Sequence, residues 1–229
     1  GTASNNVWAV GDGGIVLHFN GTAWSPVAEF GANLYDVWGT AANDIWLVGK
    51  GGRIIHYDGI AWSDVESGTG ADLFGVWGRS AGEVYVSVQD PEAGLQVYAP
   101  DGRFLRNVPG APADFHGFVI RRQPDGEFIF GATLRGQTIV KMTLEGTVVM
   151  TVPASAIPDR FKVRNARSVE LAVALTSLDV APNGDLYVTD GYASDFVHRF
   201  DRAGTYLGSF GGKEAPYRFN TLHKIAIDT

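Results

Sequence analysis

The chain of 229 residues contains no cysteine, no run of lysine or arginine and no long apolar stretch. The absence of cysteine excludes disulfide bonds and zinc sites built from thiolates. Because the formal net charge is −7 and the basic residues are scattered, the sequence lacks the basic surface that binds nucleic acid or anionic membranes. No apolar stretch approaches the roughly 20 residues of a membrane-spanning helix, so we expect no membrane span.

The chain does contain a repeat. Residues 11–27 read GDGGIVLHFNGTAWSPV and residues 49–65 read GKGGRIIHYDGIAWSDV, with nine of seventeen positions identical at an offset of 38 residues. A period of about 40 residues made of short β-rich segments is typical of a β-propeller, in which each repeat is one four-stranded blade. A blade cannot bury both its faces alone, so the blades must stack side by side in a ring. Function is then expected at the central channel of the ring or on the loops.

We therefore predict an all-β fold, a β-propeller with five blade-equivalents. Thirty glycines and many β-branched and aromatic residues favour short strands joined by tight turns. The predicted strands lie at 5–11, 15–21 and 23–27 in the first blade, at 34–39, 44–49, 53–59 and 61–65 in the second, at 73–78, 83–88, 95–102 and 103–108 in the third, at 116–120, 127–132, 138–146 and 147–152 in the fourth, and at 177–182, 185–190, 196–204 and 205–210 in the fifth.

The C-terminal segment of the chain supplies the kind of strand that the first blade lacks. Leu222–Asp228 reads as one more inner strand, and the first blade lacks its inner strand. Either this strand closes the ring by pairing with the first blade, which removes an exposed edge, or the chain is a fragment of a larger or six-bladed ring. We favour the fragment, because both ends fall within a blade and the chain begins with Gly1 rather than Met.

The repeats change in character along a single predicted propeller of residues 1–229. All six tryptophans lie between Trp8 and Trp77, four of them in VWG or AWS contexts, so residues 1–93 form the Trp-rich blades. In residues 94–229 the strands instead close on APDG, TLEG and DRAG turns. We expect the tryptophans to pack between blades, with stacking on a glycan as the alternative.

An insertion at about 154–175 separates the fourth and fifth blades. It is rich in basic residues, and its second half, Ala166–Leu175, is expected to form a short helix. The alternative is a solvated connector without a function of its own.

Histidine occurs at one repeated position. His116 and His223 stand at the entrance to the innermost strand of their blades, where the blade between them has Thr176 and earlier blades have Phe74 and Tyr35. In a six-bladed ring, histidines on alternate blades would converge on one spot of the axis. Three imidazoles with an open fourth position form a catalytic zinc site. The alternative is that each histidine only bonds across the strand ends.

The blades after residue 94 resemble NHL repeats. The stretch DVAPNGDLYVTDGYASDFVHRFDRAGTYLGSFGG and the later RFNTLHKIAID are similar to the propeller of peptidyl-α-hydroxyglycine α-amidating lyases and their bacterial relatives. In that family a DGY loop follows the second strand of one blade, a PH motif opens the next blade, and a PHG motif opens an earlier one. The matching residues here are Asp190-Gly191-Tyr192, Leu222-His223 and Phe115-His116-Gly117.

This resemblance implies a zinc-dependent lyase that splits a peptidyl-α-hydroxyglycine into a peptide amide and glyoxylate. His116 and His223 would be zinc ligands, and Tyr192 would be the catalytic base. The resemblance also implies a calcium ion in the channel, bound in part by a backbone carbonyl near Phe118. The Trp-rich half resembles VWG-type repeats of bacterial surface proteins, from which we expect an extracellular or periplasmic location.

Several positions depart from the lyase pattern. The third histidine ligand and the arginine of the family would lie beyond residue 229. The family's proline before the second histidine is Leu222 here, and the residue after it is Lys224, whose charge would repel a cation.

The other singled-out polar residues have structural explanations. We predict that His18, His56 and His198 pack within their blades. Asp190 is expected to hold the turn before Gly191, as aspartate commonly does.

Two functions follow from these observations. The first is an extracytoplasmic, NHL-type binding module with an incomplete metal site, which takes a protein, peptide or glycan on its loop face or channel mouth. The second is the zinc-dependent lyase, with His116, His223 and Tyr192 at its centre. Because the chain supplies only two of the three expected zinc ligands, the binding module is favoured.

Overall fold

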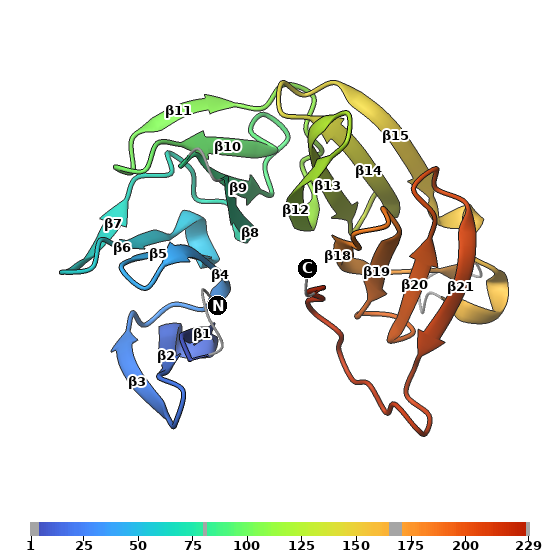
Figure 1. The fold of residues 1–229 in the computed structure, drawn as a ribbon, viewed down its shortest axis with the longest axis horizontal. Helices are drawn as coiled ribbons and strands as arrows, with labels where there is room; N and C mark the ends of the chain where they lie inside the picture. The colour runs from blue at the N-terminus through green and yellow to red at the C-terminus, as the bar shows by residue number, and fades with distance from the viewer. Residues whose placement is uncertain (1–4, 80–81, 165–170, 228–229) are drawn as a thin grey trace. The chain divides into compact units, whose positions relative to one another are not determined.

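The computed structural model describes residues 5–79, 82–164 and 171–227. By its contacts the chain divides into two compact units, Gly1–Ala113 and Asp114–Thr229. Strands joined by turns make up the described part, and the helices found there are 3-10 turns of three residues (Figure 1). The all-β prediction is confirmed.

The first unit contains three antiparallel sheets in which the strands follow one another in chain order. The first sheet has three strands, without the inner strand of the other blades, as the repeat predicted. Its strands are β1 (Val7–Val10), β2 (Ile15–Phe19) and β3 (Trp24–Glu29). The second sheet contains β4 (Leu34–Ala41), β5 (Asp44–Gly49), β6 (Ile54–Tyr57) and β7 (Trp62–Val65). The third contains β8 (Leu73–Gly78), β9 (Val84–Val88), β10 (Leu95–Tyr98) and β11 (Phe104–Asn107).

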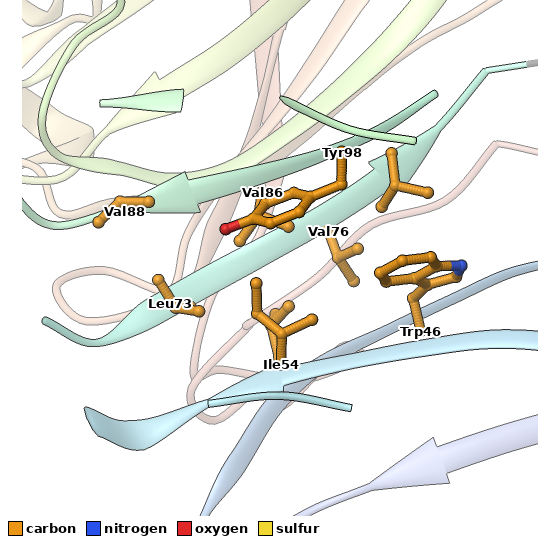
Figure 2. Packing of buried hydrophobic residues seen from close by; sticks show 9 residues of the cluster. Trp46, Ile54, Leu73, Val76, Val86, Val88 and Tyr98 are labelled. Atoms are coloured by element: carbon orange, nitrogen blue, oxygen red, sulfur yellow. The ribbon is translucent and has the colours of Figure 1, made fainter. Parts of the chain in front are cut away.

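The core of this unit lies between neighbouring sheets. Strand β5 reads as a continuous apolar run because it is buried on both faces. Trp46 and Val48 contact the third sheet in the cluster drawn in Figure 2, whereas Ile45 and Leu47 belong to a second cluster with residues of β2, β4 and β6. The second sheet is therefore stabilised by the first and third sheets on either side of it, as expected for stacked blades.

The repeated GxGG sequence forms a turn before the third strand of a blade. Gly14 and Gly52 both have φ near +78°, a conformation that other residues adopt only with strain. A Cβ atom on Gly52 would lie 1.9 Å from the carbonyl oxygen of Thr69. The glycines are thus needed for both the backbone conformation and the close approach, which accounts for their recurrence in the repeat.

Polar residues inside the blades confirm the packing prediction for two histidines. The His56 ring stacks on Trp46 with centroids 4.1 Å apart, and Asp44 bonds both the His56 Nε2 (2.8 Å) and the Trp46 indole N–H (3.0 Å). The first sheet repeats the arrangement, where His18 stacks on Trp8 at 4.4 Å. Among the tryptophans the prediction of burial is wrong for Trp24, which is 49% exposed because it lies on the outer strand β3.

The second unit contains two further four-stranded antiparallel sheets, again in chain order. One sheet contains β12 (Phe115–Gln123), β13 (Gly126–Thr133), β14 (Thr138–Thr143) and β15 (Val148–Pro153). The other contains β18 (Leu175–Val180), β19 (Leu186–Asp190), β20 (Phe196–Phe200) and β21 (Tyr206–Gly211). Their inner strands β12 and β18 pack together, and β18 is buried along its whole length.

The insertion between these sheets differs from the expectation. It contains the 3-10 turns η3 (Ala154–Ala156) and η4 (Asp159–Phe161) and the short hairpin of β16 (Val163–Arg164) and β17 (Leu171–Ala172). The expected helix at Ala166–Leu175 is wrong over residues 171–175, because Leu171, Ala172 and Leu175 belong to strands and residues 173–174 have no regular structure; residues 166–170 lie outside the described part.

The last predicted strand is also not formed. Residues 222–227 have no regular structure, and Asp228 lies outside the described residues. The segment runs back along β18 (Figure 1), held by side chains rather than by a backbone ladder. The buried carboxylate of Asp179 accepts from the backbone N–H of Ile227 at 2.8 Å and forms a bidentate pair with Arg121 at 2.9 and 2.8 Å.

Candidate functional site

The three site residues predicted from the sequence lie together in the second unit. His116 is the second residue of β12, Tyr192 lies in the loop after β19, and His223 lies in the segment after β21. The two imidazole centroids are 4.8 Å apart, and the phenol ring lies 5.2 Å from His116 and 5.4 Å from His223. We call these three residues the His–Tyr cluster. The fold gathers them from separate segments, while their chemical roles stay predictions.

His116 is held where two inner strands approach closely. The pairing of β12 with β13 shifts register between Phe115 and Gly117. At this irregularity the His116 side chain no longer follows the alternation of side chains between the two faces of the sheet. A Cβ atom on Gly117 would lie 2.6 Å from the carbonyl oxygen of Thr176, so only glycine permits this approach. The His116 Nδ1 atom lies 3.0 Å from the same carbonyl oxygen, and the ring is buried.

The loop that carries Tyr192 is fixed by Asp190. Its carboxylate accepts hydrogen bonds from the Ala174 N–H at 2.7 Å and from the Ser194 hydroxyl at 2.6 Å. The expectation that Asp190 holds this turn is confirmed. The buried carboxylate thereby ties the loop to Ala174, the residue before β18, while Tyr192 remains 49% exposed.

His223 is placed by the residue before it. The Leu222 N–H donates to Asp195 Oδ1 at 3.0 Å, and the Thr176 hydroxyl donates to the Leu222 carbonyl at 2.6 Å. A Cβ atom on Gly191 would lie 1.7 Å from that carbonyl oxygen, so the DGY glycine makes room for the segment. The His223 side chain is exposed at this position.

The hydrogen bonds of the cluster have one consistent direction. A carbonyl oxygen only accepts, so His116 Nδ1 carries a proton and donates to Thr176. In the neutral ring His116 Nε2 then accepts from the Tyr192 hydroxyl, 3.2 Å away. That hydroxyl has one proton, so it accepts from His223 Nε2, at 2.5 Å. The chain of donors runs from His223 through Tyr192 to His116.

Burial changes the titration of two groups in this region. It raises the pKa of the Tyr192 phenol, which keeps the hydroxyl protonated and able to donate to His116. Burial also raises the pKa of Asp190, against the opposing effect of its hydrogen bonds with Ser194. A catalytic base at Tyr192 would need a nearby cation to favour the phenolate.

The cluster offers part of a metal shell. His116 and His223 each direct Nε2 at the same hydroxyl, and the Nδ1 bond of His116 to a carbonyl is usual for a metal-binding histidine. No group of three or more histidine, aspartate or glutamate side chains that could hold a metal occurs in residues 5–79, 82–164 and 171–227. The donor set fits zinc only in part, since catalytic zinc sites use three protein ligands.

The sequence did not reveal the groups that support the cluster. Thr176 acts through its carbonyl and its hydroxyl, and Asp195 acts by binding the backbone of Leu222. The repeat did mark Thr176, because it occupies the same position as the two histidines. A hydrogen bond to a backbone atom leaves no pattern in the sequence, so neither role could be predicted from the sequence alone.

Comparison with known proteins identifies the fold. No protein-family model matches the chain, and no curated protein sequence matches it. Among solved structures, "YCF48 bound to D1 peptide" matches with a TM-score of 0.61 and 13% identity over 91% of this chain. A protein of unknown function from Bacteroides thetaiotaomicron matches with a TM-score of 0.67 and 13% identity over 98% of this chain.

This chain spans 64% of the YCF48 structure and 62% of the Bacteroides one, less than two thirds of each. Together with the four-stranded antiparallel blades, the matches show that the chain has the β-propeller fold. Among the residues that the structure describes, no helix is long and apolar enough to cross a membrane.

Proposed function

We propose that this chain is an extracytoplasmic, NHL-type binding module that holds a peptide segment of a protein against the His–Tyr cluster. The observation that carries the proposal is the cluster itself, where a half-exposed phenol and an exposed imidazole are backed by a buried histidine. Tyrosine combines a large contact area with a polar end and is enriched where proteins bind one another. A structure of similar fold, YCF48, is bound to a D1 peptide, which supports a peptide rather than a glycan ligand.

The site can recognise a peptide without a metal. The exposed His223 imidazole and the half-exposed Tyr192 phenol are bonded to each other and form one polar surface, and the loop that carries Tyr192 is fixed by Asp190. Because the supporting groups are already paired, a ligand would meet a preorganised surface, and little ordering would oppose binding.

A peptide-display selection tests this proposal. Random twelve-residue peptides would be selected on the wild-type chain, and the enriched sequences measured by fluorescence anisotropy. We expect binding to weaken about tenfold or more in Tyr192→Ala and His223→Ala, because a contact in the centre of an interface contributes at least this much. Tyr217→Ala is the matched control, since Tyr217 is also 49% exposed. The proposal is overturned if the enriched peptides bind all the variants equally, or if none is enriched.

A second candidate is the zinc-dependent lyase that releases glyoxylate. It is favoured by one observation, that both histidine Nε2 atoms lie within hydrogen-bonding distance of a single hydroxyl oxygen. His116 and His223 would hold the metal, which when bound would act as a Lewis acid toward a substrate oxygen. Tyr192 would then serve as the proton acceptor. A calcium ion near Phe118 belongs to the same proposal.

Zinc retention distinguishes the two candidates. The purified chain would be loaded with zinc, dialysed and analysed for metal, and glyoxylate release from α-hydroxyhippurate would be assayed in parallel. The lyase predicts one retained zinc per chain that is lost in His223→Ala and kept in His18→Gln. Equal metal content in both variants, or no retained zinc, would overturn the lyase and leave the peptide-binding proposal standing.

A further inference from the structure

A cavity of about 270 Å³ lies in the second unit, and none of the three residues of the His–Tyr cluster lines it. It is formed where the insertion packs against the fifth blade and against Ala193 and Ser194 of the loop that carries Tyr192. The residues that line it are Arg160, Phe161, Lys162, Val163, Ala193, Ser194, Phe196, Gly211, Gly212, Lys213 and Glu214. Its volume is just below the usual range of small-molecule sites, so it suits a small ligand.

The walls of the cavity are apolar and aromatic. Phe161 of η4 meets Phe196 of β20 edge to face, with ring centroids 5.0 Å apart. Val163 lies next to them in the lining, and the backbone of Gly211 and Gly212 adds no side chain. Aromatic rings favour this edge-to-face geometry, and a third ring can join the pair in the same way.

Of the four charged side chains that line the cavity, two are paired within the described residues and two, Arg160 and Glu214, form no ion pair there. The paired ones are Lys162, which lies 2.9 Å from Asp159, and Lys213, which lies 3.5 Å from Asp195. Arg160, by contrast, has its guanidinium over the Phe161 ring, 4.7 Å from the centroid, and forms no ion pair with a described residue.

Glu214 is likewise without an ion pair in the described part of the chain, and its side chain is exposed. The cavity therefore combines aromatic walls with one available cation and one available anion. A carboxylate suits the planar guanidinium of Arg160, and an ammonium suits the carboxylate of Glu214.

We propose that this cavity binds a free α-amino acid with an aromatic side chain. The ring packs against Phe161 and Phe196, the carboxylate binds Arg160, and the ammonium binds Glu214. The site uses no residue of the His–Tyr cluster, so it goes beyond both proposed functions and can hold if both fail.

Three ligands that differ by one charge test the proposal. Isothermal titration would compare L-phenylalanine with 3-phenylpropionate, which lacks the ammonium, and with L-phenylalaninamide, which lacks the carboxylate. We expect each analogue to bind about tenfold more weakly than phenylalanine, because a hydrogen bond to a charged group contributes at least that factor. The proposal is overturned if the three ligands bind equally or if none binds.

Two variants assign the charges separately. In Arg160→Gln the advantage of phenylalanine over its amide should disappear, while its advantage over 3-phenylpropionate remains. In Glu214→Gln the reverse is expected. Arg103→Gln, an exposed arginine of the first unit, is the control and should change neither ratio. If the Arg160 and Glu214 variants keep both ratios of the wild type, the assignment is refuted.

Discussion

Replacing Tyr192 with phenylalanine should destabilise the second unit by an amount that the cluster geometry predicts. The substitution removes one hydroxyl that donates to His116 and accepts from His223. His116 is only 3% exposed, so water would not readily replace the hydrogen bond that its Nε2 atom loses. Loss of a hydrogen bond at a buried acceptor costs about 1–3 kcal/mol, and the exposed His223 adds little because water replaces the phenol. We therefore expect a loss of about 1–2 kcal/mol.

The control is Tyr217→Phe, since Tyr217 has the same 49% exposure as Tyr192 and lies outside the cluster. It should change the free energy of unfolding by less than about 0.5 kcal/mol, as surface substitutions usually do. All six tryptophans are in the first unit, so tryptophan fluorescence follows that unit and far-UV circular dichroism is needed for the second. Urea unfolding of both variants would be followed by the two signals.

A double-mutant cycle with His223→Ala completes this test. Because Tyr192 and His223 share one hydrogen bond, their effects should be non-additive, with a coupling of at least about 0.5 kcal/mol. If Tyr192→Phe is no more destabilising than Tyr217→Phe, or if the cycle is additive, the hydrogen-bonded cluster is refuted.

Three further predictions concern the second unit. Gly191→Ala should displace the segment that contains Leu222, because the new Cβ atom would lie 1.7 Å from the Leu222 carbonyl oxygen. Hydrogen exchange of the backbone amides in this segment should become faster. Unchanged exchange rates would contradict the close approach. Asp179→Ala should lower the free energy of unfolding by about 2–4 kcal/mol in urea, because it removes the bidentate carboxylate that binds the partly buried guanidinium of Arg121. A loss below about 1 kcal/mol would contradict this prediction. Burial lowers the pKa of His198 to about 4, so the unfolded chain binds a proton more readily than the folded one. The free energy of unfolding should then fall by up to about 3 kcal/mol between about pH 6.5 and 4, and His198→Gln should make this fall shallower; an equal fall in the variant would contradict the assignment.

The strands were predictable from the sequence because blade packing imposes a pattern on each one. The strand Asp44–Gly49 has the predicted bounds, because a short apolar run between turn residues is typical of a strand buried between two sheets. Leu222–Ile227 has a similar pattern but is not a strand. A strand also needs a partner's backbone, and the side chains of Thr176, Asp179 and Asp195 bind this segment instead.

The site was predictable only in part. The repeat placed His116 and His223 at one position, and the lyase resemblance added Tyr192. Neither indicated that one hydroxyl would join the two imidazoles, because this depends on the loop that Asp190 fixes. The aromatic cavity was not predicted, since Arg160 lies in an insertion that has no counterpart in the repeats.

The most direct test of the central claim, that one phenol joins two imidazoles in a fixed direction, is the nitrogen spectrum of the histidines. In protein labelled with ¹⁵N-histidine at about pH 8, where a histidine of ordinary pKa is neutral, long-range ¹H–¹⁵N correlation distinguishes protonated from unprotonated ring nitrogens. We predict that His116 carries its proton on Nδ1 and His223 on Nε2, and that Tyr192→Phe shifts the Nε2 signals of both rings. A proton on Nε2 of His116, or signals that do not respond to Tyr192→Phe, would contradict the account.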